Sequence, residues 1–137
     1  MNPSTGQIKL AVIGSRTFAD KDLLCQVLDR NRHRIQLIVS GGAKGADALA
    51  EEWAHSRSVP CQVFHPKWQD EHGRFDRSAG FKRNVDVIKN ADEVLAFWDG
   101  QSTGTKHAIE LARRQNKAVQ IVNFSPESKR CALSPDL

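Results

Sequence analysis

Cysteine is scarce in this sequence and poorly placed for cross-linking or for metal binding. The 137 residues contain three cysteines, Cys25, Cys61 and Cys131, which are widely separated and odd in number. There is no Cys-x-x-Cys pair, and neither the cysteines nor the histidines have a spacing typical of zinc ligands. The sequence therefore predicts no disulfide framework and no metal site, and we expect no cofactor.

Long apolar runs are also missing. No stretch approaches the ~20 apolar residues of a membrane-spanning helix, and no signal-peptide pattern precedes the first strand-like segment. We therefore expect a soluble, cytoplasmic protein that does not contact membranes. The formal net charge of +4 permits an anionic ligand. Because that charge is low for a protein that wraps DNA, a nucleic-acid partner is not expected.

Length and composition are those of one globular domain. Hydrophobic residues make up 39% and charged residues 26% of the chain, which excludes bulk disorder. We expect a single domain over residues 1–123. Residues 124–137 contain Pro126, Pro135 and few apolar side chains, which indicates a C-terminal tail.

Short apolar runs alternate with helical patterns along the domain. The runs predict strands at residues 8–13, 35–39, 61–64, 93–97 and 118–122. Apolar periodicity predicts intervening helices, the first with Thr17 as its N-cap and later ones after residue 45, over 79–90 and over 104–115. The alternation predicts an α/β fold: a three-layer Rossmann-like sandwich with a parallel sheet of about five strands in the order 3-2-1-4-5.

A glycine-rich loop follows the second predicted strand. Its sequence, Ser40 to Asp47, is SGGAKGAD, and a helical pattern begins directly after it. Glycines allow a ligand to approach the backbone closely, and a helix N-terminus attracts anions. The spacing matches neither a Walker loop nor the dinucleotide fingerprint. The glycines indicate either a tight strand–helix turn or an anion-binding loop.

Two further polar turns are predicted at the same edge of the sheet as this loop. Residues 14–17 follow the first strand, and residues 98–105 follow the fourth, so the reversal of strand order falls between them. The loops at 14–17, 40–47 and 98–105 are therefore expected to meet around one ligand. Residues 65–78 lack periodicity, which is typical of a loop that serves a site or is mobile.

Two acidic residues in these loops have alternative roles. Asp47 either caps the following helix or accepts hydrogen bonds from ribose hydroxyls. Asp99 either forms a turn before Gly100 or acts as a general acid or base. Trp68 and Trp98 belong to the core or form a wall on which a base stacks.

Four motifs together resemble a known family. The segments GSRTF at 14–18, SGGAKGAD at 40–47, KRN at 82–84 and AFWDG-x-S-x-GTK at 96–106 are similar to the YspA/YpsA-related branch of the SLOG superfamily. The match extends in order from about Leu10 to Val122. The superfamily includes the DNA-processing protein DprA and the LOG phosphoribohydrolases, which cleave the N-glycosidic bond of nucleoside 5′-monophosphates. The resemblance implies a Rossmann-like fold that binds a nucleotide or a nucleotide-derived ligand.

The LOG pattern is only partly present. Arg83 matches the arginine of LOG enzymes, and Gly104 with Thr105 matches their Gly–Thr pair. The glutamate that follows in those enzymes is replaced by Ala108, and Glu110 lies about 200° further round the helix. A LOG-like reaction would need another carboxylate, for which Asp99 is the candidate.

These observations give one main interpretation and two alternatives. The protein binds a nucleotide-like small molecule as a sensor or sequestering module, and a homodimer or other homo-oligomer is compatible with this. The alternatives are a LOG-like nucleotide N-glycosidase with Asp99 and Arg83 as catalytic residues, and DprA-like DNA binding. The predicted ligand-binding residues are Gly14, Ser15, Arg16, Ser40, Gly41, Gly42, Lys44, Gly45, Asp47, Arg83, Asn84, Trp98, Gly100, Ser102, Gly104, Thr105 and Lys106.

Overall fold

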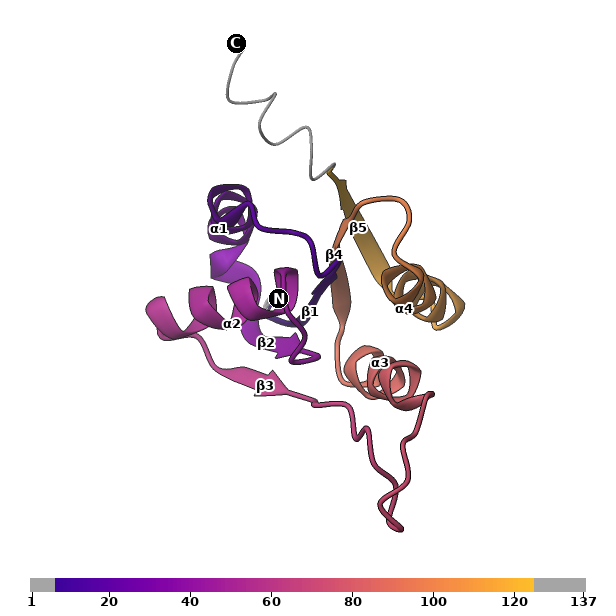
Figure 1. Ribbon diagram of the computed structural model, residues 1–137. Coiled ribbons are helices and arrows are strands. Elements are labelled where there is room, and N and C mark those ends of the chain that lie inside the picture. Colours follow the sequence, from indigo (N-terminus) through magenta and orange to yellow (C-terminus); the bar gives the residue numbers. More distant parts are fainter. Residues whose placement is uncertain (1–6, 125–137) are drawn as a thin grey trace.

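A single five-stranded parallel sheet forms the centre of the molecule in the computed structural model, which describes residues 7–124 (Figure 1). The sheet order is β3-β2-β1-β4-β5, and all neighbouring strands pair in parallel. The predicted fold class and strand order are confirmed. The strands are β1 (Ile8–Gly14), β2 (Ile35–Ser40), β3 (Cys61–Val63), β4 (Glu93–Trp98) and β5 (Ala118–Asn123).

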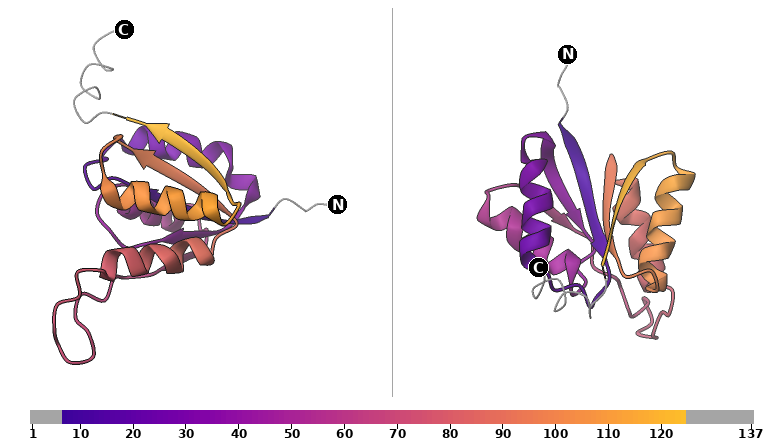
Figure 2. Two further views of the ribbon diagram at one scale, coloured as in Figure 1. Left: turned by 90° about the vertical axis from the view of Figure 1, so that its right-hand side faces the viewer. Right: turned by 90° about the horizontal axis from the view of Figure 1, so that it is seen from above.

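Helices cover both faces of the sheet (Figure 2). One layer contains α1 (Lys21–Arg30) and α2 (Ala46–Ser56), and the other contains α3 (Ala79–Lys89) and α4 (Thr103–Arg114). A short 3-10 helix, η1 (Arg32–Arg34), leads into β2. None of the helices in residues 7–124 has the length and apolar character needed to cross a bilayer. The predicted tail lies outside the described residues apart from Phe124.

Alternate residues of β1 belong to two separate cores. Leu10 and Val12 pack with α1 and α2, whereas Ala11 and Ile13 pack with α3 and α4. Because β1 lies at the centre of the sheet and is covered on both faces, its sequence is a continuous apolar run rather than an alternating one. This pattern is the signal that identifies the central strands in the sequence.

The start of α1 differs from the prediction. The N-cap is Asp20, whose Oδ1 accepts the Leu23 N–H at 3.1 Å, so Thr17 as the N-cap is wrong. The intervening residues place Phe18 in the core, where its ring centroid lies 4.6 Å from that of Phe97. A burial requirement that local sequence does not reveal therefore delays the helix by one turn.

The segment from 65 to 78 projects away from the layers as a loop between β3 and α3 (Figures 1 and 2). Gln69 and Phe75 form an antiparallel bridge within it. The Asp70 carboxylate accepts the N–H groups of His72 and Arg74 and pairs with the Arg74 guanidinium at 3.2 Å. The segment lacks sequence periodicity but has a defined hairpin structure.

Candidate functional site

Three loops interlock at the carboxyl edge of the sheet. Ser15 donates its N–H to the Phe97 carbonyl at 3.0 Å, and the Asp99 N–H donates to Ser15 Oγ at 3.3 Å. Gly45 has a φ of 80°, and a Cβ there would lie 2.3 Å from the Ser15 carbonyl oxygen. Glycine is therefore required where the loop before α2 crosses the loop after β1.

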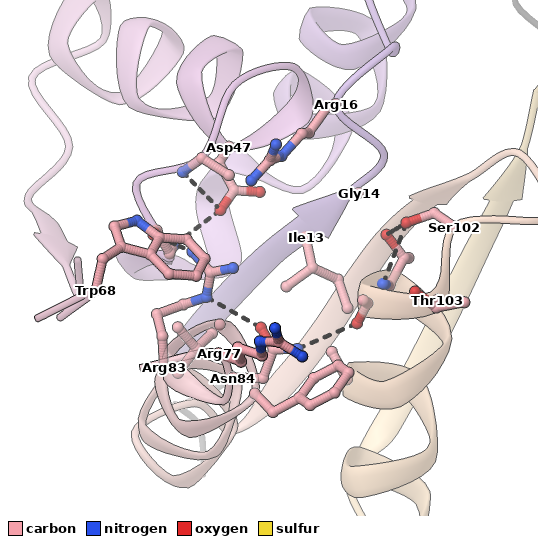
Figure 3. Close-up of a pocket in the computed structure, with 18 residues that line it drawn as sticks. Ile13, Gly14, Arg16, Asp47, Trp68, Arg77, Arg83, Asn84, Ser102 and Thr103 are labelled. Atoms are coloured by element: carbon pink, nitrogen blue, oxygen red, sulfur yellow. Dashed lines mark hydrogen bonds between the residues drawn. The ribbon is translucent and has the colours of Figure 1, made fainter. Parts of the chain in front are cut away.

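A cavity of about 360 Å³ lies between these loops and the beginnings of α3 and α4 (Figure 3). This volume is within the range of small-molecule sites. The cavity is lined by Ile13, Gly14, Arg16, Gly41, Ala43, Asp47, Trp68, Arg77, Gly80, Phe81, Arg83, Asn84, Val87, Ser102, Thr103, Gly104, Thr105 and Ala108.

About half of the predicted binding residues line this cavity. Those that do are Gly14, Arg16, Gly41, Asp47, Arg83, Asn84, Ser102, Gly104 and Thr105. Those outside its lining are Ser15, Ser40, Gly42, Lys44, Gly45, Trp98, Gly100 and Lys106. Sequence reasoning missed Arg77, because the weak patterning around it gives no indication that the chain returns to the site there. It also missed Phe81, which it placed on a predicted helix without a role in the site.

Several residues outside the lining hold the loops in place. Ser40 Oγ donates to Glu51 Oε2 at 2.6 Å and accepts the Gly42 N–H at 3.2 Å, which joins β2 to α2. Trp98 Nε1 donates to the Ser102 carbonyl at 3.1 Å, which fixes the approach to α4. These contacts give Ser40, Gly42 and Trp98 a supporting role, and their direct contact with a ligand stays a prediction.

Asp99 forms a turn. Its Oδ1 accepts the N–H of Gln101 at 2.9 Å and that of Ser102 at 2.8 Å. The hydrogen bond from Ser102 is the main cause that lowers the pKa of Asp99 below 3.8, since it stabilises the ionised form. The carboxyl lies outside the cavity lining, so its catalytic role stays a prediction without a contact to support it.

Asp47 is the carboxylate that lines the cavity within residues 7–124. It is buried, and its Oδ2 accepts the N–H of Gly41 at 2.9 Å and that of Ala43 at 3.4 Å. Burial raises the pKa of Asp47 from 3.8 to about 6, while the charge of Arg83 and the two amide hydrogen bonds oppose this rise. Asp47 thus shapes the glycine-rich loop and also faces the site.

Arg83 binds the same loop from the other side. Its Nη1 donates to the Gly41 carbonyl at 2.5 Å, and its Nε donates to Asn84 Oδ1 at 3.1 Å. Burial lowers the pKa of Arg83 from 12.5, and the charge of Asp47 opposes this shift. The Gly41 residue is therefore held by Asp47 at its N–H and by Arg83 at its carbonyl.

Asn84 connects the two helices that frame the cavity. Its Nδ2 donates to the Gly104 carbonyl at 3.1 Å and lies 3.2 Å from His107 Nδ1. The His107 ring packs against Phe81 with centroids 4.4 Å apart, and burial lowers the pKa of His107 from 6.5. Asn84 therefore positions the N-terminus of α4 relative to α3.

The chemistry of the cavity favours anions. Three arginines, Arg16, Arg77 and Arg83, line it, against one buried carboxyl group. The first turn of α4 also lines it, and the N-terminus of a helix carries partial positive charge. Among the described residues, no group of three or more His, Cys, Asp or Glu side chains is placed to hold a metal ion.

Three comparisons place this chain among known proteins. A model of the YspA, cpYpsA-related SLOG family matches residues 8–71. The gene 61 protein of Mycobacterium phage D29 is 31% identical over 125 residues, which cover 85% of this chain and 95% of that protein. A solved structure of DNA processing protein A from Helicobacter pylori has a TM-score of 0.65 at 18% identity and covers 92% of this chain and 72% of that one. At this identity the structural likeness shows the fold.

One expectation drawn from net charge is wrong. The +4 charge argued against a nucleic-acid partner, yet the structure from Helicobacter pylori is described for its single-stranded DNA binding mode. A protein with this fold therefore binds DNA, and neither the fold nor the modest charge excludes such a partner. Net charge averages over the whole surface, whereas three arginines of this chain line one cavity.

Proposed function

The chain belongs to the YspA, cpYpsA-related SLOG family, and on that premise we propose that it binds a nucleotide, either free or as a unit of a single-stranded nucleic acid. The observation that supports this proposal is the meeting of three arginines, the start of α4 and an aromatic side chain around one cavity. A nucleotide combines an anionic phosphate with a flat base, and these groups match the two kinds of lining.

The phosphate is proposed to bind between α4 and the arginines. Gly104 and Thr105 lie in the first turn of α4, where backbone N–H groups and the helix dipole favour a negative charge. Arg83 faces this turn across the cavity (Figure 3) and supplies a planar guanidinium for a charge-assisted hydrogen bond. The superfamily resemblance assigns the same two elements to the ligand.

The base is proposed to lie against Trp68. The indole of Trp68 lines the cavity and is 40% exposed, so one face of the ring is available for stacking. Asp47 lies deeper and on the side of the glycine-rich loop, where its free oxygen is suited to accept ribose hydroxyls. A nucleotide bound in this way spans the cavity from the N-terminus of α4 to Trp68.

A hydrolytic function has one observation in its favour. Asp47 is a buried carboxyl group in the cavity with a pKa raised to about 6, which is a property of many general acids and bases. Ala108 nevertheless occupies the position of the LOG glutamate and lines the same cavity. Binding without turnover is therefore the function that we propose first.

A thermal-shift panel tests the proposal. The probes are the common nucleoside 5′-monophosphates, ADP-ribose, cyclic dinucleotides and a ten-residue oligothymidylate, each with its unphosphorylated nucleoside as control. A ligand at 100 times its Kd should stabilise the protein by about 2.7 kcal/mol. If no phosphorylated probe raises the Tm more than its nucleoside does, the proposal is overturned.

A further inference from the structure

Two aromatic side chains of the projecting hairpin lie beside each other on the surface. Trp68 is 40% exposed and Phe75 is 67% exposed. Their ring centroids are 5.9 Å apart, and their planes differ by 5°. Neither residue belongs to the two hydrophobic cores of the fold, so the burial of apolar surface in the monomer does not account for them.

The hairpin holds these rings in a defined position. The Gln69–Phe75 bridge and the Asp70–Arg74 pair fix its two strands. At its base, Asp76 accepts hydrogen bonds from the N–H and Oγ of Ser78 and pairs with Lys82 at 2.8 Å, which attaches it to the start of α3. A preorganised surface loses little entropy on binding.

The aromatic pair extends the cavity outward. Trp68 lines the cavity, whereas Phe75 lies next to it outside the lining. Arg77 follows Phe75 by two residues and lines the cavity, so the same segment also supplies a cation to the site (Figure 3). The carboxylates of Asp70 and Asp76 are each paired with a cation, which reduces repulsion of a polyanion.

We propose that Phe75 stacks the base adjacent to the one held at Trp68, and that the ligand of this site is a single strand of at least two nucleotides. Arg77 contacts the phosphate between them. The inference rests on the proposed function, because the first nucleotide occupies the cavity described above. A strand fits both features: neighbouring aromatic rings stack successive bases, and a cation supplied by the same segment neutralises the connecting phosphate.

Fluorescence anisotropy with labelled oligothymidylate, together with calorimetry for thymidine 5′-monophosphate, tests the proposal. Phe75→Ala should weaken oligonucleotide binding about fivefold or more and leave mononucleotide binding unchanged. Trp68→Ala should weaken both. Phe75→Tyr, which keeps the ring, should restore oligonucleotide affinity. Val85→Ala serves as a matched control, since Val85 is 41% exposed on α3 and lies outside the cavity lining.

The outcomes separate this inference from the proposed function. If the wild type binds the mononucleotide but binds the oligonucleotide no more tightly, or if Phe75→Ala leaves oligonucleotide affinity unchanged, the second stacking position is refuted and nucleotide binding stands. If the wild type binds neither probe, the inference falls, and the thermal-shift panel decides the proposed function. A Phe75-dependent dimer in sedimentation, with unchanged oligonucleotide affinity, would assign the hairpin to self-association and overturn the inference.

Discussion

Gly41 is held at both ends of its backbone by charged side chains. Asp47 accepts its N–H, and Arg83 donates to its carbonyl. A Cβ at Gly41 would lie 2.6 Å from Arg83 Cδ and 2.9 Å from Asp47 Oδ2, so the two side chains occupy the space that any other residue would need. The glycine, the carboxyl group and the guanidinium therefore depend on one another at the centre of the site.

Asp47 should make stability fall as pH rises through the range from about 4 to 6. Its pKa is about 6 in the folded protein against the ordinary 3.8 of an aspartate in the unfolded chain, so the folded state holds the proton more tightly than the unfolded state. The stabilisation is complete below pH 4 and is lost as Asp47 ionises, a change of about 3 kcal/mol. Urea denaturation of the wild type and Asp47→Asn between pH 4 and pH 7.5 measures this difference.

Asp99 provides the control for this prediction. Its pKa is lowered in the folded protein, so its contribution is present above pH 3.8 and is lost as pH falls further. In Asp99→Asn, the free energy of unfolding should therefore still fall between pH 4 and pH 6 as it does in the wild type. Parallel pH profiles for the wild type and Asp47→Asn would contradict the role given to Asp47.

Arg83→Ala should weaken binding of a nucleotide more than binding of the corresponding nucleoside. Two of its nitrogens already bind Gly41 and Asn84, and Nη2 makes no hydrogen bond to another residue within 7–124. Nη2 is thus the atom available for phosphate, and its loss removes a charge-assisted hydrogen bond of about 1.5–3 kcal/mol. Calorimetry of the wild type and the variant with the nucleotide and the nucleoside measures how far the Kd of each ligand rises. Equal weakening of both ligands would show that Arg83 acts only through the loop.

At the level of the elements, close packing between loops defines the site. Gly45 and Gly100 both have a positive φ, of 80° and 83°, and the ψ of Gly45 is −128°. A Cβ at Gly45 would meet the backbone of Ser15 and Arg16, whereas a Cβ at Gly100 would meet nothing within 4 Å. Gly45 is therefore required both by its backbone conformation and by the lack of space, whereas at Gly100 only the positive φ opposes a side chain.

Alanine substitutions at these two glycines test the contribution of the loop crossing to stability. Gly100→Ala should cost about 1–2 kcal/mol of folding free energy, the price of a left-handed conformation. Gly45→Ala should cost at least about 2 kcal/mol more, because the loop after β1 has to move. Chemical denaturation measures both values. Equal losses at the two positions would mean that the crossing of the loops contributes nothing to stability.

The bridge between α3 and α4 depends on one buried amide. Asn84→Ala removes the donor to the Gly104 carbonyl and the acceptor for Arg83 Nε. Leaving such buried partners without a hydrogen bond costs about 1–3 kcal/mol. Val85→Ala on the exposed side of α3 should change stability by less than about 0.5 kcal/mol. Denaturation curves that coincide for the two variants would show that the bridge is unimportant.

The elements also show what the sequence could and could not predict. The strands were predictable because β1 and β4 are buried on both faces and are therefore continuous apolar runs. The N-cap of α1 could not be predicted, because the burial of Phe18 decides where the chain turns into the helix. The hairpin could not be predicted either, because it is held by hydrogen bonds and ion pairs of the Asp70 and Asp76 side chains and shows no periodicity in its sequence. Arg77 was missed as a lining residue for the same reason.

For the whole molecule, the distribution of charge carries more information than its sum. The +4 charge corresponds to 20 basic and 16 acidic residues spread along the chain. Folding brings Arg16 to the same cavity as Arg77 and Arg83, which lie about 60 residues further along the chain. A clustered positive potential of this kind attracts polyanions even when the total charge is small. Sequence composition could not reveal the cluster, because it arises from the strand order and from the return of the hairpin to the site.

The whole-molecule function is tested most directly by the fate of a bound nucleotide. Ala108 lines the cavity at the position where the LOG pattern has glutamate. The Asp99 carboxylate accepts hydrogen bonds from the N–H groups of its own turn. Loss of a general acid or base typically costs 10²- to 10⁴-fold in rate, or about 3–5 kcal/mol in the barrier. We therefore expect the wild type, at concentrations equal to the substrate, to release no free base from nucleoside 5′-monophosphates over hours. Chromatography of the reaction mixture measures the release.

Ala108→Glu places a carboxylate at the position of the missing glutamate and is the variant in which base release should first be detected. Release by the wild type that Asp47→Asn abolishes would instead make Asp47 the general acid or base and the protein a hydrolase, and would overturn binding without turnover.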